Sequence, residues 1–267
     1  MTGTLPLLTE TLARARSEGR AALVTYHPAG FPTVDEGIAA ILATLDAGAD
    51  VVEVGLPHSD PVLDGPVIQT ADDIALRGGV RIADVLRTVR EVHAATGKPV
   101  LVMSYWNPVS RYGVERFARE LAAAGGAGCV LPDLPVSESG PWRRQAAEHG
   151  LATVFVVAPS STDAQLAETA AAGTGFVYAS ALMGVTGTRD SVDEAAAVLA
   201  GRLRAVTDLP VCVGMGVSDA RQAAHVARFA DGVIVGSALV ATLLDAADDG
   251  RSALTRLTGE LAAGVRA

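Results

Sequence analysis

Residues 52–69, VEVGLPHSDPVLDGPVIQ, join the end of an apolar strand to an acidic loop. The β-branched run that ends at Val54 predicts a buried strand, and the glycines and prolines after it indicate that the strand stops there. Glu53 is therefore expected to be half buried, where a carboxylate is costly unless it is paired or used. Two more acids, Asp60 and Asp64, follow before a helix can begin.

The strand-and-helix unit around this stretch recurs along the chain. The hydrophobic pattern predicts an amphipathic helix over residues 5–18, and then short apolar strands that are each followed by turn residues and an alanine-rich helix. The eight expected strands are residues 21–26, 51–54, 99–103, 127–131, 152–157, 175–179, 210–213 and 232–235.

These repeats predict the fold class. Nearly unbroken apolar strands that alternate with helices are typical of a parallel sheet covered on both faces. Eight such units fit the roughly 250 residues of an α/β barrel. The chain is therefore predicted to be a (β/α)8 TIM barrel with an extra N-terminal helix, and residues 1–267 are expected to form one domain. A doubly wound open sheet is the alternative fold.

Composition and charge disfavour several classes of function. A net charge of −9 argues against nucleic acid and anionic membrane as partners, because both require a basic surface. No apolar window reaches membrane-spanning length, and the N-terminus lacks a basic segment before an apolar run. Cys129 and Cys212 lie in apolar segments, as buried thiols in a reducing compartment do. A cytoplasmic protein is expected.

In a barrel of parallel strands, function is expected where the strands end. Polar, aromatic or glycine residues gather at those ends: Glu53, Ser104, Tyr105, Asn107, Asp133, Tyr178, Ser180, Gly214, Gly216, Gly236 and Ser237. Two of the glycine turns, VGMGVS at residues 213–218 and IVGSAL at 234–239, open directly into helices. Glycine lets the backbone approach an anion and a helix N-terminus attracts it, so this pair predicts a phosphate site. Ordinary tight turns would also require glycine.

A third glycine-rich segment follows the sixth expected strand. Residues 183–189, MGVTGTR, are long enough to form a lid over a ligand, and Gly184 could contribute an N–H group.

The residues that the chain lacks also restrict its chemistry. Lys98 is the only lysine and precedes the third strand, at the wrong end of a barrel for a Schiff base or for covalently bound pyridoxal phosphate. The five histidines are scattered without metal-ligand spacing, so no metal site is expected. No cofactor is expected in this chain either. The remaining equipment predicts acid/base chemistry on a phosphorylated small molecule.

Each candidate residue also has a structural interpretation. Glu53 could be a structural acid paired with a basic group, and Asp64 could be only a turn-forming residue. The apolar and aromatic candidates Tyr26, Met103, Tyr105 and Tyr178 could each be ordinary packing, although together they would form an apolar slot beside the carboxylates.

Six motifs carry a resemblance to a known family. They are residues 52–69, SYWNPV at 104–109, VLPDLPVSES at 130–139, MGVTG at 183–187, VGMGVS at 213–218 and VGSALV at 235–240. In this order they resemble the tryptophan synthase alpha chain family over essentially the whole length. The resemblance implies a TIM-barrel lyase that cleaves indole-3-glycerol phosphate to indole and glyceraldehyde 3-phosphate in tryptophan biosynthesis.

The resemblance also assigns roles to residues. It implies that Glu53 and Asp64 are catalytic, with Tyr178 near the glutamate. It further implies that Gly184, Gly216, Gly236 and Ser237 bind phosphate and that Tyr26 and Met103 line an indole pocket. Tyr105 and Thr186 are expected to complete the substrate site.

The implied partner is a tryptophan synthase beta chain in an α2β2 heterotetramer, and pyridoxal phosphate is expected only in that beta chain. A stand-alone lyase that releases free indole, and a non-catalytic barrel subunit that regulates a partner, remain as alternatives. The chain departs from the family pattern at Phe31, His58 and Ala181, which affects the expected substrate rim and the contacts with the partner.

Overall fold

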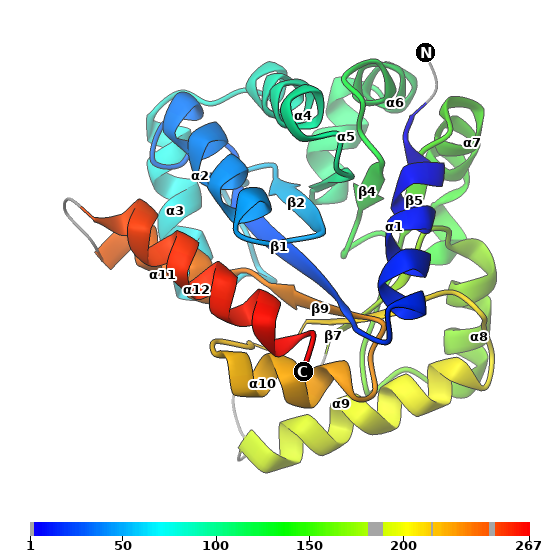
Figure 1. The fold of residues 1–267 in the computed structure, drawn as a ribbon. Helices are drawn as coiled ribbons and strands as arrows, with labels where there is room; N and C mark the ends of the chain where they lie inside the picture. The colour runs from blue at the N-terminus through cyan, green and yellow to red at the C-terminus, as the bar shows by residue number, and fades with distance from the viewer. Residues whose placement is uncertain (1–2, 181–188, 215, 246–248) are drawn as a thin grey trace.

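The computed structural model describes residues 3–180, 189–214, 216–245 and 249–267, which form parallel strands surrounded by helices (Figure 1). The strands are β1 (Ala22–Pro28), β2 (Val51–Gly55), β3 (Val100–Met103), β4 (Gly128–Val130), β5 (Ala152–Val154), β6 (Val156–Val157), β7 (Val177–Ser180), β8 (Val211–Gly214) and β9 (Gly232–Val235). The helices are α1 (Leu5–Ser17), α2 (Val34–Asp46), α3 (Pro66–Arg77), α4 (Ile82–Thr96), α5 (Trp106–Tyr112), α6 (Val114–Ala123), α7 (Gly140–His149), α8 (Asp163–Ala172), α9 (Arg189–Arg204), α10 (Ala220–Ala227), α11 (Ser237–Asp245) and α12 (Gly250–Gly264), with a 3-10 turn η1 (Val136–Glu138).

The strands close into a barrel. Their order is β5-β4-β3-β2-β1-β9-β8-β7-β6, and every pair is parallel. β5 and β6 are two parts of one stretch interrupted at Phe155, whose carbonyl accepts a hydrogen bond from Tyr178 N at 3.0 Å. The nine segments therefore correspond to the eight predicted strands. Because β1 pairs with β9 and the two ends of the strand order, β5 and β6, are parts of one stretch, the sheet closes on itself and the open doubly wound alternative is wrong.

The period of two along the strands separates an inner from an outer core. Val24, Val51 and Leu101 face the interior of the barrel, whereas their neighbours Leu23 and Val52 pack under the surrounding helices. All five side chains are fully buried, so each contributes about 1.5–3 kcal/mol of hydrophobic stabilisation. Since both faces of the strands are covered, the strands are apolar almost without alternation.

The predicted N-terminal helix closes one end of the barrel. Leu8, Leu12 and Ala15 of α1 are buried in the same cluster as the inward-facing strand residues. In Figure 1 this helix lies across the end of the barrel from which β1 starts. The carboxyl ends of the strands, where the candidate site residues lie, are therefore at the opposite end.

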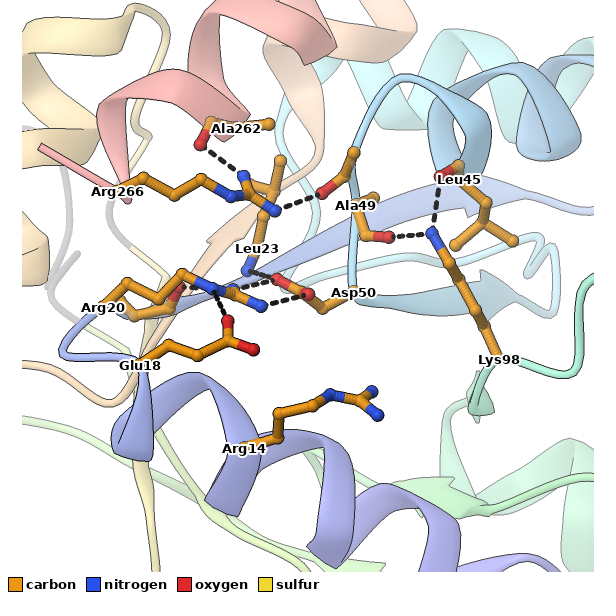
Figure 2. Close-up of polar contacts among 12 residues, drawn as sticks. Arg14, Glu18, Arg20, Leu23, Leu45, Ala49, Asp50, Lys98, Ala262 and Arg266 are labelled. Carbon is orange, nitrogen blue, oxygen red and sulfur yellow. Dashed lines mark hydrogen bonds and ion pairs between the residues drawn. The ribbon is translucent and has the colours of Figure 1, made fainter.

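Charged residues at that N-terminal end tie neighbouring strands together (Figure 2). Arg20, before β1, makes two hydrogen bonds of 2.8 and 3.0 Å to the carboxylate of Asp50, before β2. Asp50 also accepts a hydrogen bond from Leu23 N at 2.9 Å. Lys98 Nζ donates to the carbonyls of Leu45 and Ala49 at 2.6 and 2.7 Å. The only lysine thus holds the end of α2 and is remote from the strand ends that carry the candidate site.

The structure bears on two expectations drawn from composition, the burial of the cysteines and the membrane-spanning potential of the helices. The side chains of Cys129 and Cys212 are fully buried, as predicted. Within the described ranges, no helix combines the length and the apolar character needed to cross a membrane.

Candidate active site

Glu53 is fully buried in the middle of β2, rather than half buried near the strand end as the sequence suggests. The alternation of β2 directs it into the barrel, level with Tyr26 of β1 and Leu101 of β3. Neither carboxylate oxygen has a hydrogen-bond partner among the described residues. Burial without a partner disfavours the charged form and raises the pKa of Glu53 to about 8. Near neutral pH this side chain is therefore mainly a neutral acid, which disfavours the paired structural interpretation.

Asp64 lies in the loop between β2 and α3 and is held by Tyr105. The Tyr105 hydroxyl donates to Asp64 Oδ2 at 2.8 Å and accepts from Leu63 N at 2.9 Å. Gln69 Nε2 donates to the Asp64 carbonyl at 2.7 Å. Burial raises the pKa of Asp64, while the hydrogen bond from Tyr105 and the nearby His58 oppose that rise. Asp64 is thus a more polar and better partnered acid than Glu53.

Tyr26 and Tyr178 fill the upper interior of the barrel because glycines leave room for their rings. A Cβ on Gly55 would lie 2.6 Å from Tyr26 Cζ, and a Cβ on Gly214 would lie 2.8 Å from Tyr178 Cζ. Burial raises the pKa of both phenols, and the charge of Glu53 contributes to each rise. Both rings therefore lie close enough to Glu53 to shape its environment.

The two predicted phosphate turns lie side by side, because β8 pairs with β9 and Gly214 is in register with Ile234. Gly216 has a φ of +69°, a conformation that favours glycine. Ser237 is exposed at the start of α11, where the first N–H groups of a helix have no intrahelical partner. Gly236 also lies against Tyr26, since a Cβ there would be 3.2 Å from the tyrosine Cβ. This position therefore has a packing reason to be glycine in addition to its predicted phosphate role.

A small pocket brings several of the predicted residues together. Four of its lining residues, Tyr26, Asp64, Met103 and Tyr105, were predicted as site residues, and it is completed by Leu56, Asp72, Ser104 and Pro132. Glu53 is fully buried on β2 and Tyr178 is half buried on β7, whereas Gly216, Gly236 and Ser237 lie just beyond the ends of β8 and β9. The predicted Gly184 and Thr186 lie outside the described residues.

Asp72 is a pocket residue that the motif-based prediction missed. It is only 2% exposed, on α3, and its Oδ2 accepts a hydrogen bond from His58 N at 3.3 Å. Burial is the main reason that its pKa rises to about 7, and the charge of Asp64 adds to the rise. A periodic signal was present, because the buried positions of α3 are Ile68, Ala71, Asp72 and Ala75. An acid at a position of the apolar stripe predicts a buried carboxyl group.

Comparison with known proteins identifies the family. The tryptophan synthase alpha chain family profile matches residues 12–265. The chain belongs to the tryptophan synthase alpha chain family. The alpha chain of Streptomyces avermitilis is 74% identical over 262 residues, which cover 97% of this chain and 95% of the relative. That of Streptomyces coelicolor is 71% identical over 268 residues, with 100% and 99% covered.

Solved structures of the tryptophan synthase family share the fold. A chain of Mycobacterium tuberculosis tryptophan synthase, in space group F222, superimposes with a TM-score of 0.91 at 51% identity, covering 97% of this chain and 98% of that one. The alpha subunit from Legionella pneumophila gives a TM-score of 0.89 at 30% identity, covering 99% and 98%. Like its family, the chain is the carbon-carbon lyase subunit that cleaves indole-3-glycerol phosphate in tryptophan biosynthesis.

Proposed function

We propose that Glu53 and Asp64 divide the acid/base chemistry of the lyase reaction between them. The carrying observation is the difference in their environments: Glu53 is buried without a partner, whereas Asp64 is hydrogen-bonded at the pocket. Two carboxyl groups whose pKa values are set by different surroundings can serve separate acid and base roles. The substrate, indole-3-glycerol phosphate, is cleaved between indole C3 and the glycerol carbon bonded to it.

Glu53 supplies and then removes a proton. As a neutral acid it protonates indole C3, which makes the ring carbon an acceptable leaving group. The resulting carboxylate takes the proton of the hydroxyl on the glycerol carbon attached to C3. Electrons of that O–H bond form the aldehyde of glyceraldehyde 3-phosphate, while the C3–carbon bond breaks and its electrons return to the ring. Glu53 ends protonated, so the cycle balances without a lysine or a metal.

Asp64 stabilises the positive charge that protonation places on the ring. As a carboxylate it accepts the indole N1–H and faces the indolenine-like intermediate. The Tyr105 hydroxyl, 2.8 Å from Asp64 Oδ2, lowers the proton affinity of the carboxylate and fixes its direction. Tyr178 assists as the phenol close to Glu53, and Tyr26 and Met103 form the apolar side of the slot for the indole ring.

The phosphate of the substrate binds at the ends of β8 and β9. Gly216, Gly236 and Ser237 offer backbone and hydroxyl groups there, and we assign Gly184 and Thr186 to the same end of the substrate. The N-terminus of α10 is already capped by Asp219, whose Oδ1 accepts from Gln222 N at 2.8 Å. The N-terminus of α11, which begins at Ser237, is therefore the better place for an anion.

A pyridoxal-phosphate-dependent beta chain is the proposed partner, in an α2β2 heterotetramer located in the cytoplasm. The loop that carries Asp60 and Asp64 also carries Val62 and Leu63, whose exposed fractions of 71% and 57% are large for apolar side chains. Neighbouring exposed apolar groups indicate a surface that another protein covers. No cofactor is assigned to this chain, which we propose to work as one barrel domain over residues 1–267.

Indole release from indole-3-glycerol phosphate, measured with and without a beta chain, tests this function. We expect Glu53→Gln to lower the lyase rate by about 10²–10⁴-fold, because a positioned acid/base group contributes that factor. A rate within about tenfold of wild type would remove Glu53 from the mechanism. Co-elution with a beta chain and a rise in rate on its addition would separate the heterotetramer from a stand-alone lyase. Absence of any lyase rate in the isolated chain would favour a regulatory subunit.

A further inference from the structure

Asp72 occupies an apolar position of α3 that faces the catalytic pocket. Its neighbours on the same face, Ile68, Ala71 and Ala75, are buried in an apolar cluster that also contains Tyr26. An apolar side chain at position 72 would therefore suit the packing of this helix. A buried acid here needs a reason other than stability.

The contacts of Asp72 connect α3 to the start of the loop that carries Asp64. Asp72 Oδ2 accepts the backbone N–H of His58 at 3.3 Å. At its far end, the same loop is held by Tyr105, which binds both Leu63 N and Asp64 Oδ2. The ring of His58 also packs on Tyr105, with 4.9 Å between the ring centroids. The loop is thus fixed at both ends by side chains that line the pocket.

The second oxygen of Asp72 is unsatisfied. Oδ1 is buried and has no hydrogen-bond partner among the described residues. The carboxyl lines the pocket together with Asp64, Tyr26 and Tyr105, and its raised pKa reflects burial together with the charge of Asp64. A half-satisfied carboxyl beside a catalytic acid costs stability, and such costs concentrate at functional sites.

We propose that Asp72 is a positioning residue for the lyase reaction, which fixes the loop through the His58 N–H and thereby places Asp64 against the indole nitrogen. This inference rests on the role proposed for Asp64. It predicts an effect on the chemical step rather than on substrate affinity, because Asp64 acts most strongly on the charged intermediate. A displacement of about 1 Å can cost about 10²-fold in rate.

Three variants test the proposal by steady-state kinetics of indole release. Asp72→Val has a similar shape, suits the apolar face and cannot accept a hydrogen bond, so we expect kcat to fall by about 10- to 100-fold while KM changes less than about threefold. Asp72→Asn retains an acceptor for the His58 N–H and should keep kcat within about threefold of wild type. Asp73→Ala is the matched control, since Asp73 is the neighbouring exposed acid that pairs with Arg77 on the surface.

The results separate this inference from the proposed function. Equal kcat for wild type and Asp72→Val, or an equal loss in Asp72→Val and Asp72→Asn, would overturn the positioning role. If Asp72→Val does not fold, Asp72→Ala with a urea unfolding curve on the same sample replaces it. Asp64→Asn, measured in parallel, tests the underlying assignment: an unchanged rate there would reject the role of Asp64 itself.

Discussion

The hydroxyl of Tyr105 lies 2.8 Å from Asp64 Oδ2 and 2.9 Å from Leu63 N, so one phenol orients both the acid and the backbone beside it. Tyr105 follows β3, which pairs with the β2 strand that carries Glu53. The rigid barrel thus provides the fixed point against which the loop of Asp64 is held. A substrate-binding role, expected for Tyr105 from the sequence, is compatible with this contact but does not account for it.

Tyr105→Phe should remove this restraint while it keeps the ring. We expect kcat for indole release to fall by about tenfold or more, since Asp64 loses a hydrogen bond to its charged form and its orientation. The acidic limb of the kcat profile should move to higher pH, because that hydrogen bond opposes the raised pKa of Asp64. Tyr112→Phe, which removes a phenol that bonds Glu120 far from the pocket, is the control. An unchanged pH profile in Tyr105→Phe would contradict the interpretation.

Gly55→Ala should damage the site through Tyr26. The added Cβ would lie 2.6 Å from Tyr26 Cζ, so the ring must move out of its place beside the pocket. Overpacking of this kind typically costs about 1–3 kcal/mol, which urea unfolding would detect, and the lyase rate should fall with it. Gly140→Ala is the matched control, because a Cβ there meets nothing within 4 Å. Normal stability and normal turnover of Gly55→Ala would refute the packing argument.

Glu53 should make stability depend on pH. Its folded-state pKa of about 8 is above the unfolded value near 4.3, so between these limits the unfolded chain loses a proton that the folded chain keeps. The contribution of Glu53 to the free energy of unfolding is therefore fully present below a pH of about 4.3. It declines by up to about 1.4 kcal/mol per pH unit until a pH of about 8, above which the decline levels off. The free energy of unfolding, measured with urea from pH 5 to 9, should fall less steeply with pH for Glu53→Gln than for wild type. Parallel slopes would mean that Glu53 is not a buried neutral acid.

Arg20→Ala should destabilise the protein without affecting its chemistry. The side chains of Arg20 and Asp50 are 10% and 11% exposed, so loss of the arginine leaves a nearly buried carboxylate whose one remaining hydrogen-bond donor among the described residues is the Leu23 N–H (Figure 2). Breaking such a pair costs about 3 kcal/mol. Since the pair lies at the N-terminal end of the barrel, kcat should stay unchanged at a temperature where the variant is folded. Arg77→Ala, which breaks a surface pair with Asp73, should cost less than about 1 kcal/mol.

The fold was largely predictable because its signal is repetitive. Each strand is apolar on both faces and is followed by glycine or proline. A wrong boundary for one strand therefore does not change the number of strand-and-helix units that is predicted. The break of the fifth strand at Phe155 was not predictable, since the sequence there remains apolar and only the pairing with Tyr178 shows where the ladder changes partner.

The candidate site was predictable where chemistry and position coincide. Glu53 stands out as an acid in an apolar strand, and Asp64 lies in a punctuated loop. The contact between Tyr105 and Asp64 was not predictable, because the two are 41 positions apart in the chain and meet only when β2 and β3 pair. Asp72 lies outside every motif of the resemblance, and only its place on the apolar stripe of α3 indicates that it is buried.

The position of α1 determines the end of the barrel by which substrate and product pass. Leu8, Leu12 and Ala15 fill the N-terminal end of the barrel, so its interior opens toward the carboxyl ends of the strands. With Glu53 in the role that we propose, indole leaves the barrel by the same end at which the substrate enters. A protein bound over this end, against the exposed Val62 and Leu63, would therefore control where the indole goes.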